Sequence, residues 1–305
     1  MTTLIFTHYG VTPYLRKTME FAHYSNPSIR KILIGDHSNE ALAKEAGWEW
    51  IDVDIFTTKR IQEFNNLFVT LSGSKHKNIK NYRNWTHYVF YRWFVIEEVL
   101  ESLCINEFWH FDSDTLILES LSEYDYLQTL YTSMMQCNSM CLNGFVKRKI
   151  VNEYCDSLII QFQNKSLLKG YQQEFEISKN FAFTEMRGFQ NYKEMTSHNF
   201  VSGLGLSDEF VFDDCLCQDH GFELTTLADG KGAKEIVFDN GKAFFLKDGK
   251  KTLAVTLNLS WLNETVIDAI IIALKVKAGK SLSEIKLPIT VWLVGLARRI
   301  KKVFF

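Results

Sequence analysis

The chain has 305 residues, which is enough for one large domain or two smaller ones. Its 46% hydrophobic and 23% charged residues, with only 3 prolines, are typical of a globular protein and exclude a collagen-like repeat or extensive disorder. The 34 basic and 36 acidic side chains give a net charge of −2, so no overall positive field favours nucleic acid as a partner.

Three short apolar runs near the start of the chain predict strands at residues 4–7, 31–35 and 50–54. Helical stretches at residues 14–24 and 40–46 separate them, and this alternation is typical of a parallel sheet with helices on its faces. The sequence therefore predicts an α/β fold. Ligands of such sheets bind beyond the carboxyl ends of the strands, so we expect residues 7–10 and 36–39 to converge on one pocket.

The turn after the first strand argues against a dinucleotide-binding site. Such sites have the pattern Gly-x-Gly-x-x-Gly at this position, whereas this turn contains only Gly10. We therefore expect the pocket to bind a different ligand.

An aromatic and basic segment occupies residues 81–103. Its apolar side chains fall at helical spacing from Tyr88 onward, and we expect most of its aromatic rings in the core. Arg83 and Arg92 are candidates for function because a guanidinium can bind two diphosphate oxygens at once. An ion pair with a glutamate on a helix is the alternative for these arginines.

Asp112 and Asp114 lie between two predicted strands, in the run FWHFDSDTLIL at residues 108–118. Residues two apart in an extended chain point to the same side, so both carboxylates could face one point. Carboxylates at the end of a buried strand cost free energy unless they are neutralised, and a divalent cation would neutralise both. Ordinary turn or helix-cap chemistry is the alternative for an isolated Asp-x-Asp. The position of this pair, within a parallel α/β pattern, favours a metal site.

The order of these elements resembles glycosyltransferases of the GT-A type, particularly bacterial capsule and lipopolysaccharide sugar transferases. The resemblance rests on RWFVI at residues 92–96 followed by FWHFDSD at residues 108–114, and it covers residues 1 to 260 approximately. It implies a Rossmann-like fold that transfers a sugar from a nucleotide-diphosphate donor, with a UDP-sugar favoured, to a surface-polysaccharide or lipid-linked acceptor. It also implies that the Asp-x-Asp motif holds Mn²⁺ or Mg²⁺ against the donor diphosphate.

The resemblance also implies roles for individual side chains. Asp112 and Asp114 would bind the metal. Asn258 stands where related transferases often have a histidine that completes the metal or diphosphate site, so the third ligand is left open between Asn258, water and another histidine. For the residues at the ends of the first two strands, an ordinary strand-end role is the alternative. The side chains expected to contact the donor are Thr7, His8, Tyr9, Asp36, Arg83, Arg92 and Ser113.

The second half of the chain contains a predicted strand at residues 131–137 and a predicted helix at residues 151–161. Between them, Asn143 and Gly144 form a turn at which such transferases often hold the donor sugar or the acceptor. The pattern weakens between residues 170 and 203, and we expect a mobile acceptor-side region there.

Four acidic residues follow Ser207 within a short stretch of chain. Ser207 can cap a helix, and capping alone would explain Asp208 and Glu209 in the first helical turn. The functional alternative is that one of them, Asp208 before Glu209, acts as a general base in an inverting reaction. In a retaining reaction it would stabilise positive charge on the sugar ring.

The C-terminal segment, residues 275–305, carries eight basic and one acidic side chain, a net charge of +7. Its apolar side chains recur at helical spacing from Pro288, and it ends in Phe304 and Phe305. This pattern favours an amphipathic basic helix that binds the anionic inner face of the cell membrane, although a helix docked on the domain would also explain it. We accordingly expect a cytoplasmic protein that associates peripherally with the membrane.

The expected organisation is a catalytic domain at residues 1–262 and a helical extension at residues 263–305. The catalytic domain would have a nucleotide-sugar half at residues 1–118 and an acceptor half at residues 119–262. Six cysteines without an N-terminal apolar signal segment favour reduced thiols over disulfides, and their spacing does not favour zinc. No run has the roughly 18 apolar residues that a membrane-spanning helix needs.

Two other functions remain possible on the same fold. A nucleotidyltransferase would make the activated sugar, but it should have a glycine-rich basic loop after the first strand. A non-catalytic subunit of a polysaccharide assembly complex would bind the nucleotide sugar without turnover.

Overall fold

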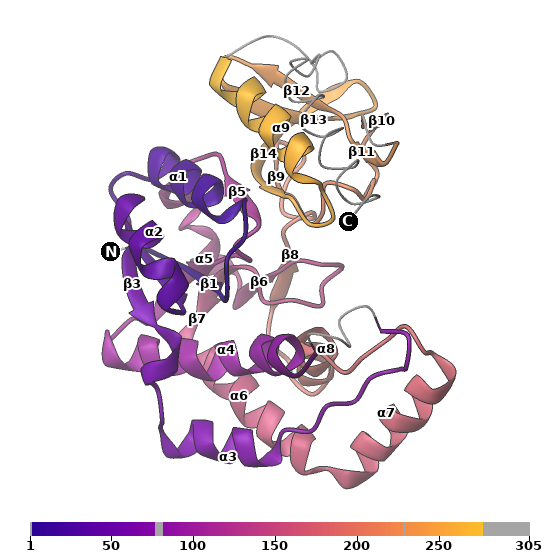
Figure 1. The fold of residues 1–305 in the computed structure, drawn as a ribbon. Helices are drawn as coiled ribbons and strands as arrows, with labels where there is room; N and C mark the ends of the chain where they lie inside the picture. The colour runs from indigo at the N-terminus through magenta and orange to yellow at the C-terminus, as the bar shows by residue number, and fades with distance from the viewer. Residues whose placement is uncertain (1, 77–81, 228–229, 277–305) are drawn as a thin grey trace, which may run out of the picture. The chain divides into compact units, whose positions relative to one another are not determined.

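A computed structural model describes residues 2–76, 82–227 and 230–276 (Figure 1). The chain forms two compact units, and it passes from one to the other five times. The first unit comprises Met1–Val11, Asn26–Ser113 and Leu121–Ser202, and the second comprises Thr12–Ser25, Asp114–Ser120 and Gly203–Phe305. The catalytic halves expected at residues 1–118 and 119–262 are functional divisions, and they stay predictions.

The first unit is built on a five-stranded sheet with the order β3-β2-β1-β4-β7. The first four strands in that order are parallel, and β7 runs antiparallel to β4. This topology confirms the predicted α/β fold with a largely parallel sheet. The strands are β1 (Thr3–His8), β2 (Arg30–Gly35), β3 (Glu49–Asp52), β4 (Glu107–His110) and β7 (Gly144–Lys147).

Helices cover this sheet, and α3, α4, α6 and α8 lie close together in Figure 1. Ile5, Ile32 and Phe108 from the sheet share one buried core with Phe64 of α3 and Trp93 of α4. Most aromatic rings of α4 are therefore in the core, as predicted. The helices of this unit are α2 (Glu40–Glu45), α3 (Lys59–Leu67), α4 (Tyr82–Ser102), α5 (Leu127–Leu130), α6 (Arg148–Gln163), α7 (Lys165–Ile177) and α8 (Glu185–Glu194).

Residues 170–203 contain more regular structure than the sequence predicted. They include most of α7, all of α8, and β8 (Phe200–Ser202), which pairs in parallel with β6 (Ser133–Met135). Each of the two helices buries a pair of aromatic rings, Tyr171 with Phe175 and Phe189 with Tyr192. These pairs are spaced at four and three residues, which is helical spacing, so the segment packs on the core of the first unit.

The second unit contains a sheet with the order β12-β13-β14-β5, and β9 also pairs with β14. A buried ion pair between Lys234 Nζ and Asp213 Oδ1 (2.5 Å) lies beside this sheet, and both side chains are fully buried. The elements are α1 (Leu15–Ser25), β5 (Thr115–Ile117), β9 (Phe210–Phe212), β10 (Leu224–Thr226), β11 (Gly232–Lys234), β12 (Ile236–Asp239), β13 (Lys242–Lys247), β14 (Lys250–Asn258) and α9 (Glu264–Val276).

The prediction of a helix after Ser207 is wrong. The Ser207 hydroxyl instead accepts a hydrogen bond from the Glu209 backbone N–H (3.0 Å), which closes a short turn before β9. Pairing of β9 with β14 outweighs the local capping pattern, because a strand in a sheet satisfies the same backbone groups that a helix would.

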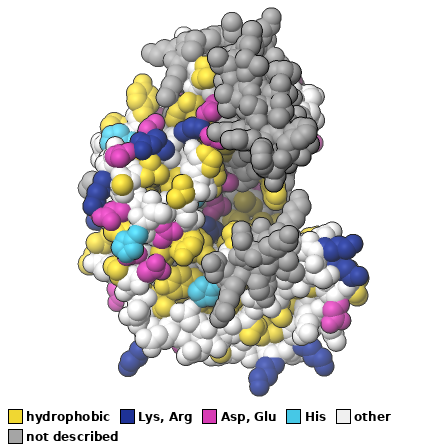
Figure 2. Space-filling model, viewed as in Figure 1, with side chains coloured by type: hydrophobic (Ala, Val, Ile, Leu, Met, Phe, Trp, Pro, Cys, Tyr) yellow, Lys and Arg dark blue, Asp and Glu magenta, His cyan; other side chains and the backbone are white. Residues whose placement is uncertain are grey.

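The C-terminal extension is described only as far as α9. Ile267 and Ile270 of this helix pack in the core of the second unit, and Lys17 of α1 pairs with Asp268 (2.6 Å). The rest of the predicted amphipathic helix, residues 277–305, lies outside the described residues. Among the helices that are described, none is long and apolar enough to cross a membrane. On the face in Figure 2, basic and acidic side chains are intermingled.

Candidate functional site

The carboxyl ends of β1 and β2 meet at one edge of the first sheet. His8 is paired with Gly35 in the strand register, and the Gly10 N–H donates a hydrogen bond to Asp36 Oδ2 (2.5 Å). Residues 7–10 and 36–39 therefore converge, as the sequence predicted for a ligand site at this edge.

Asp36 holds this edge together. Its Oδ1 accepts hydrogen bonds from the Ser38 backbone N–H (2.8 Å), from the Ser38 hydroxyl and from Asn39 Nδ2 (3.2 Å). Burial alone would raise the pKa of Asp36, but the hydrogen bonds from Ser38 and Gly10 lower it overall. With these donors on its two oxygens, Asp36 has few acceptor positions left for a nucleoside.

His8 and Ser113 join the ends of β1 and β4. The distance from His8 Nδ1 to Ser113 Oγ is 2.7 Å, and both residues are buried. Burial lowers the pKa of His8 to about 4, although the nearby Asp36 charge acts in the opposite direction. Thr7 is buried beside His8, whereas Tyr9 is half exposed and its ring centre lies 5.4 Å from that of Tyr88 on α4.

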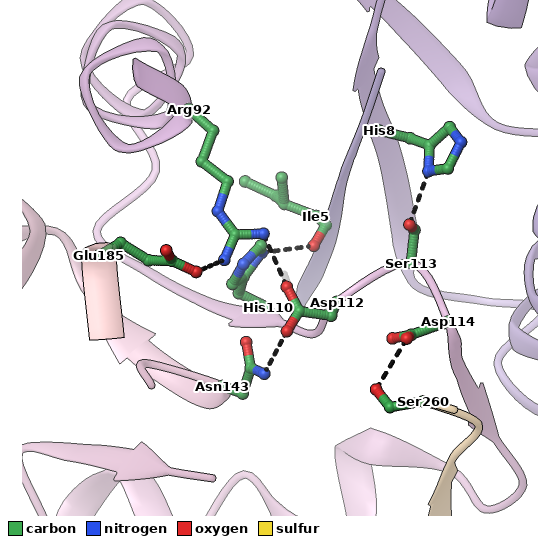
Figure 3. A network of polar contacts seen from close by, with 10 residues as sticks. All are labelled: Ile5, His8, Arg92, His110, Asp112, Ser113, Asp114, Asn143, Glu185 and Ser260. Atoms are coloured by element: carbon green, nitrogen blue, oxygen red, sulfur yellow. Dashed lines mark hydrogen bonds and ion pairs between the residues drawn. The ribbon is translucent and has the colours of Figure 1, made fainter. Parts of the chain in front are cut away.

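Four side chains, which we call the Arg92 cluster, gather beyond the end of β4 (Figure 3). They are Arg92, Asp112, Asn143 and Glu185. Arg92 Nη1 donates to Asp112 Oδ1 (2.6 Å), and Asn143 Nδ2 donates to Asp112 Oδ2 (3.0 Å). Arg92 Nη2 lies 3.4 Å from Glu185 Oε1. The cluster therefore fixes both oxygens of Asp112 and two branches of the guanidinium.

Burial and neighbouring charges shift the pKa values of the titratable groups in and beside the Arg92 cluster. Burial would raise the pKa of Asp112, but Arg92 and the other neighbouring donors hold it below its usual value. Burial raises the pKa of Glu185 to about 7 against the opposing effect of Arg92. His110, fully buried with its Nδ1 3.0 Å from the Ile5 carbonyl, has its pKa lowered to about 4 by burial and by the Arg92 charge.

Asp112 is the open member of the cluster. Its side chain is 27% exposed, whereas that of Arg92 is 8% exposed and that of Glu185 is 11% exposed. Arg92 Nε and Asn143 Oδ1 are buried and have no hydrogen-bond partner in the described part of the chain. Arg92 itself forms ion pairs, which was one of the two roles that the sequence left open.

A close backbone approach shapes the turn at Asn143. Gly144 has a φ of +116°, and a Cβ placed there would lie 2.0 Å from Met134 Cε and 2.7 Å from Met134 Cβ. A glycine is therefore needed at this position for Asn143 to reach Asp112.

Asp114 and Asn258 come together in the second unit. Asp114 Oδ2 accepts a hydrogen bond from the Ser260 hydroxyl (2.9 Å), and Asn258 Oδ1 accepts one from the Ser260 N–H (2.9 Å). The Leu259 N–H donates to the Asp114 carbonyl (2.9 Å). The chain thus places the second acid of the motif beside the residue predicted as a further ligand.

The remaining predicted site residues are not part of the Arg92 cluster. Asp208 and Glu209 have exposed side chains in the second unit, and their carbonyls accept hydrogen bonds from Thr252 and Leu253 of β14. Arg83 lies in the first turn of α4, and its side chain lies outside the described residues.

The oxygen donors of Asp112 and Asp114 suit Mn²⁺ or Mg²⁺, which proteins often bind through one or two carboxylates together with substrate phosphates. Over residues 2–76, 82–227 and 230–276, no group of three or more His, Cys, Asp or Glu side chains has the arrangement of a metal site. No disulfide joins the six cysteines in the described part of the chain.

Sequence reasoning missed Glu185, which lies 93 residues from Arg92. Only a folded chain reveals this contact. The sequence singled out the Asn143 turn but did not connect it with Asp112, although an Asn-Gly pair after a predicted strand was a usable signal.

No protein-family model and no curated protein matches the chain. Among solved structures, mouse xyloside xylosyltransferase 1 is similar with a TM-score of 0.44 and 8% identity, over 65% of this chain and 83% of that one. The PaToxG glycosyltransferase is similar with a TM-score of 0.36 and 10% identity, over 64% and 69%. A cytidylyltransferase from Leptospira borgpetersenii serovar Hardjo-bovis (strain JB197) is similar with a TM-score of 0.34 and 10% identity, over 66% of this chain and 74% of that one.

The Gly144→Ala variant should lower the free energy of unfolding by about 2 kcal/mol, because it combines a strained φ with overlap onto Met134. Urea denaturation measures this change. The matched control is Gly170→Ala in α7, where an added Cβ meets nothing within 4 Å and the change should be neutral or stabilising by up to about 1 kcal/mol. Equal unfolding midpoints for the two variants would contradict this account.

The stability of the ligand-free protein should fall as the pH drops from 6.5 to about 4, because the unfolded state takes up the His8 proton first. Above pH 6.5 His8 is neutral in both the folded and the unfolded state, so its contribution to stability is fully present there. The loss is on the order of 3 kcal/mol for His8. In urea titrations across this range, His8→Gln should flatten the pH dependence of unfolding by up to one proton, and an unchanged slope would show that His8 is not responsible.

Proposed function

We propose that this chain is a metal-dependent glycosyltransferase that moves a sugar from a nucleotide-diphosphate donor to a surface-polysaccharide or lipid-linked acceptor. The observation that carries the proposal is Asp112, a partly open carboxylate at the carboxyl edge of a parallel sheet, held by Arg92 and Asn143. Ligands of such sheets bind at this edge, and the loops after β1 and β2 already meet there.

Asp112 and Asp114 would hold a Mn²⁺ or Mg²⁺ ion, with Asn258 or water among the further ligands. When bound, this ion supplies positive charge to the diphosphate leaving group. The protein contributes the fixed orientation of Asp112, because its two oxygens are set by separate donors from α4 and from the Asn143 turn. Such prior orientation avoids the free-energy cost of reorganising polar groups during the reaction.

His8, Ser113 and Tyr9 would line the nucleoside side of the site. The half-exposed Tyr9 ring can stack on a planar base, and UDP is the nucleotide we favour. His8 is neutral near pH 7, so it would recognise hydroxyl groups rather than add positive charge. Asp208 and Glu209 remain proposed acceptor-side groups, because their side chains are exposed to solvent.

Release of nucleoside diphosphate from a panel of nucleotide sugars, with and without Mn²⁺, tests the proposal. We expect Mn²⁺-dependent UDP release that falls about 100-fold or more in Asp112→Asn and Asp114→Asn. Asp239→Asn, which alters an exposed ion pair with Lys251, is the control and should keep full activity.

Consumption of a nucleoside triphosphate with release of pyrophosphate would instead identify a nucleotidyltransferase. Tight binding without turnover on any lipid-linked acceptor would indicate a binding subunit.

We also propose that the basic C-terminal segment binds anionic lipid and places the enzyme at the inner face of the cell membrane. The support is its net charge of +7 together with its terminal aromatic residues. The full chain should cosediment with phosphatidylserine vesicles at low salt. Replacing Arg298, Arg299, Lys301 and Lys302 with Gln should release it, whereas salt-independent binding by both proteins would contradict an electrostatic anchor.

A further inference from the structure

Glu185 is the first residue of α8 and has no assigned part in the proposed reaction. Its side chain is buried, and its Oε1 lies 3.4 Å from Arg92 Nη2. The Tyr154 hydroxyl of α6 donates a hydrogen bond to the Glu185 carbonyl (2.7 Å), so the start of the helix is also held by α6. Hydrogen bonding from the backbone N–H groups of Glu185 and Met186 lowers the pKa of the Glu185 carboxyl, although burial raises it by more.

The charges of the Arg92 cluster do not cancel. With Asp112 and Glu185 ionised, Arg92 provides one positive charge against two negative charges, so a net charge of −1 remains. Asp112 is the more exposed of the two carboxylates and has the better access to an incoming cation. If Glu185 were neutral, Arg92 would balance Asp112 completely.

Geometry leads to the same conclusion as charge. A guanidinium binds a lone carboxylate preferentially with two parallel N–H groups. Here only Nη1 contacts Asp112, while Nη2 points to Glu185 and Nε has no partner in the described part of the chain. Glu185 therefore draws one branch of the guanidinium away from Asp112.

Another Arg–Glu ion pair in the same unit, between a partly exposed arginine and a buried glutamate, provides a comparison. Arg60 Nε lies 2.7 Å from Glu97 Oε2, and Arg60 also pairs with Asp156, whose side chain is 62% exposed. Burial raises the pKa of Glu97 to about 7, as it does for Glu185. Neither partner of Arg60 is a proposed metal ligand, so replacing Glu97 removes an ion pair without changing a partner of Asp112.

We propose that Glu185 is a positioning residue that holds Arg92 by its second branch and thereby keeps Asp112 available to a divalent cation. This inference rests on the proposed function, because it assigns Glu185 a part in the same site. Without the Glu185 charge, Arg92 would turn both branches toward Asp112 and close it to the metal.

Mn²⁺ binding, measured by electron paramagnetic resonance, tests this role without any turnover. Mn²⁺ is titrated into the full chain, alone and with UDP, at a pH of about 8, which is above the raised pKa of Glu185. We expect Glu185→Gln to weaken Mn²⁺ binding about 10–100-fold, which is the usual effect of losing an outer partner of a metal ligand. Glu97→Gln, the matched control, should stay within about threefold of the wild type.

Folding is checked by thermal melting of every variant. Should Glu185→Gln fail to fold, Glu185→Ser takes its place, because serine is well tolerated in the first turn of a helix. It removes the same carboxylate, so the same loss of Mn²⁺ affinity is expected.

The Asp112→Asn variant distinguishes failure of the proposed metal site from failure of the proposed role of Glu185. If Mn²⁺ binding is lost in Asp112→Asn but unchanged in the Glu185 variants, the proposed metal site stands and the role of Glu185 is refuted. Equal weakening in Glu185→Gln and Glu97→Gln would reduce Glu185 to a general structural role and also refute it. If the wild type binds no Mn²⁺ under either condition, both proposals are overturned.

Discussion

A guanidinium group that keeps its proton at every physiological pH lies buried in the first unit, and its neighbours are arranged around that charge. Removing a cation from water costs several kcal/mol, so the fold must supply negative partners at the right distance. Asp112 comes from the end of β4 and Glu185 from the start of α8. The sheet and the helices thus supply the charged groups of this cluster, and the Asn143 turn adds a hydrogen bond to Asp112.

Much of the first unit could be predicted from local sequence. The runs that form β1, β2 and β4 are apolar because both faces of a parallel sheet are covered, and polar residues follow each run where the strand ends. The meeting of Gly10 with Asp36 then follows from sheet topology alone. The metal role of Asp112 and Asp114 stays a prediction, although the structure gives Asp112 the restraint that such a role requires.

The sequence was less informative where contacts join distant residues. Around Ser207, a serine followed by acids fits a helix start, but pairing of Phe210–Phe212 with β14 determines the outcome. Tertiary pairing of this kind routinely overrides local preference. The aromatic pairs of α7 and α8 had helical spacing, yet the polar residues around them obscured it. Glu185 could not have been found at all, because its partner is brought to it only by folding.

The path of the chain limits how this protein can be made and divided. Leu4 of β1 pairs with Trp109 of β4, so a strand that leaves the ribosome early must wait for a partner synthesised about a hundred residues later. The first unit needs residues up to Ser202, while part of the second has already emerged at residues 12–25 and 114–120. No single cut in the gene yields either unit intact, and an expressed fragment would expose an unfinished apolar core to aggregation.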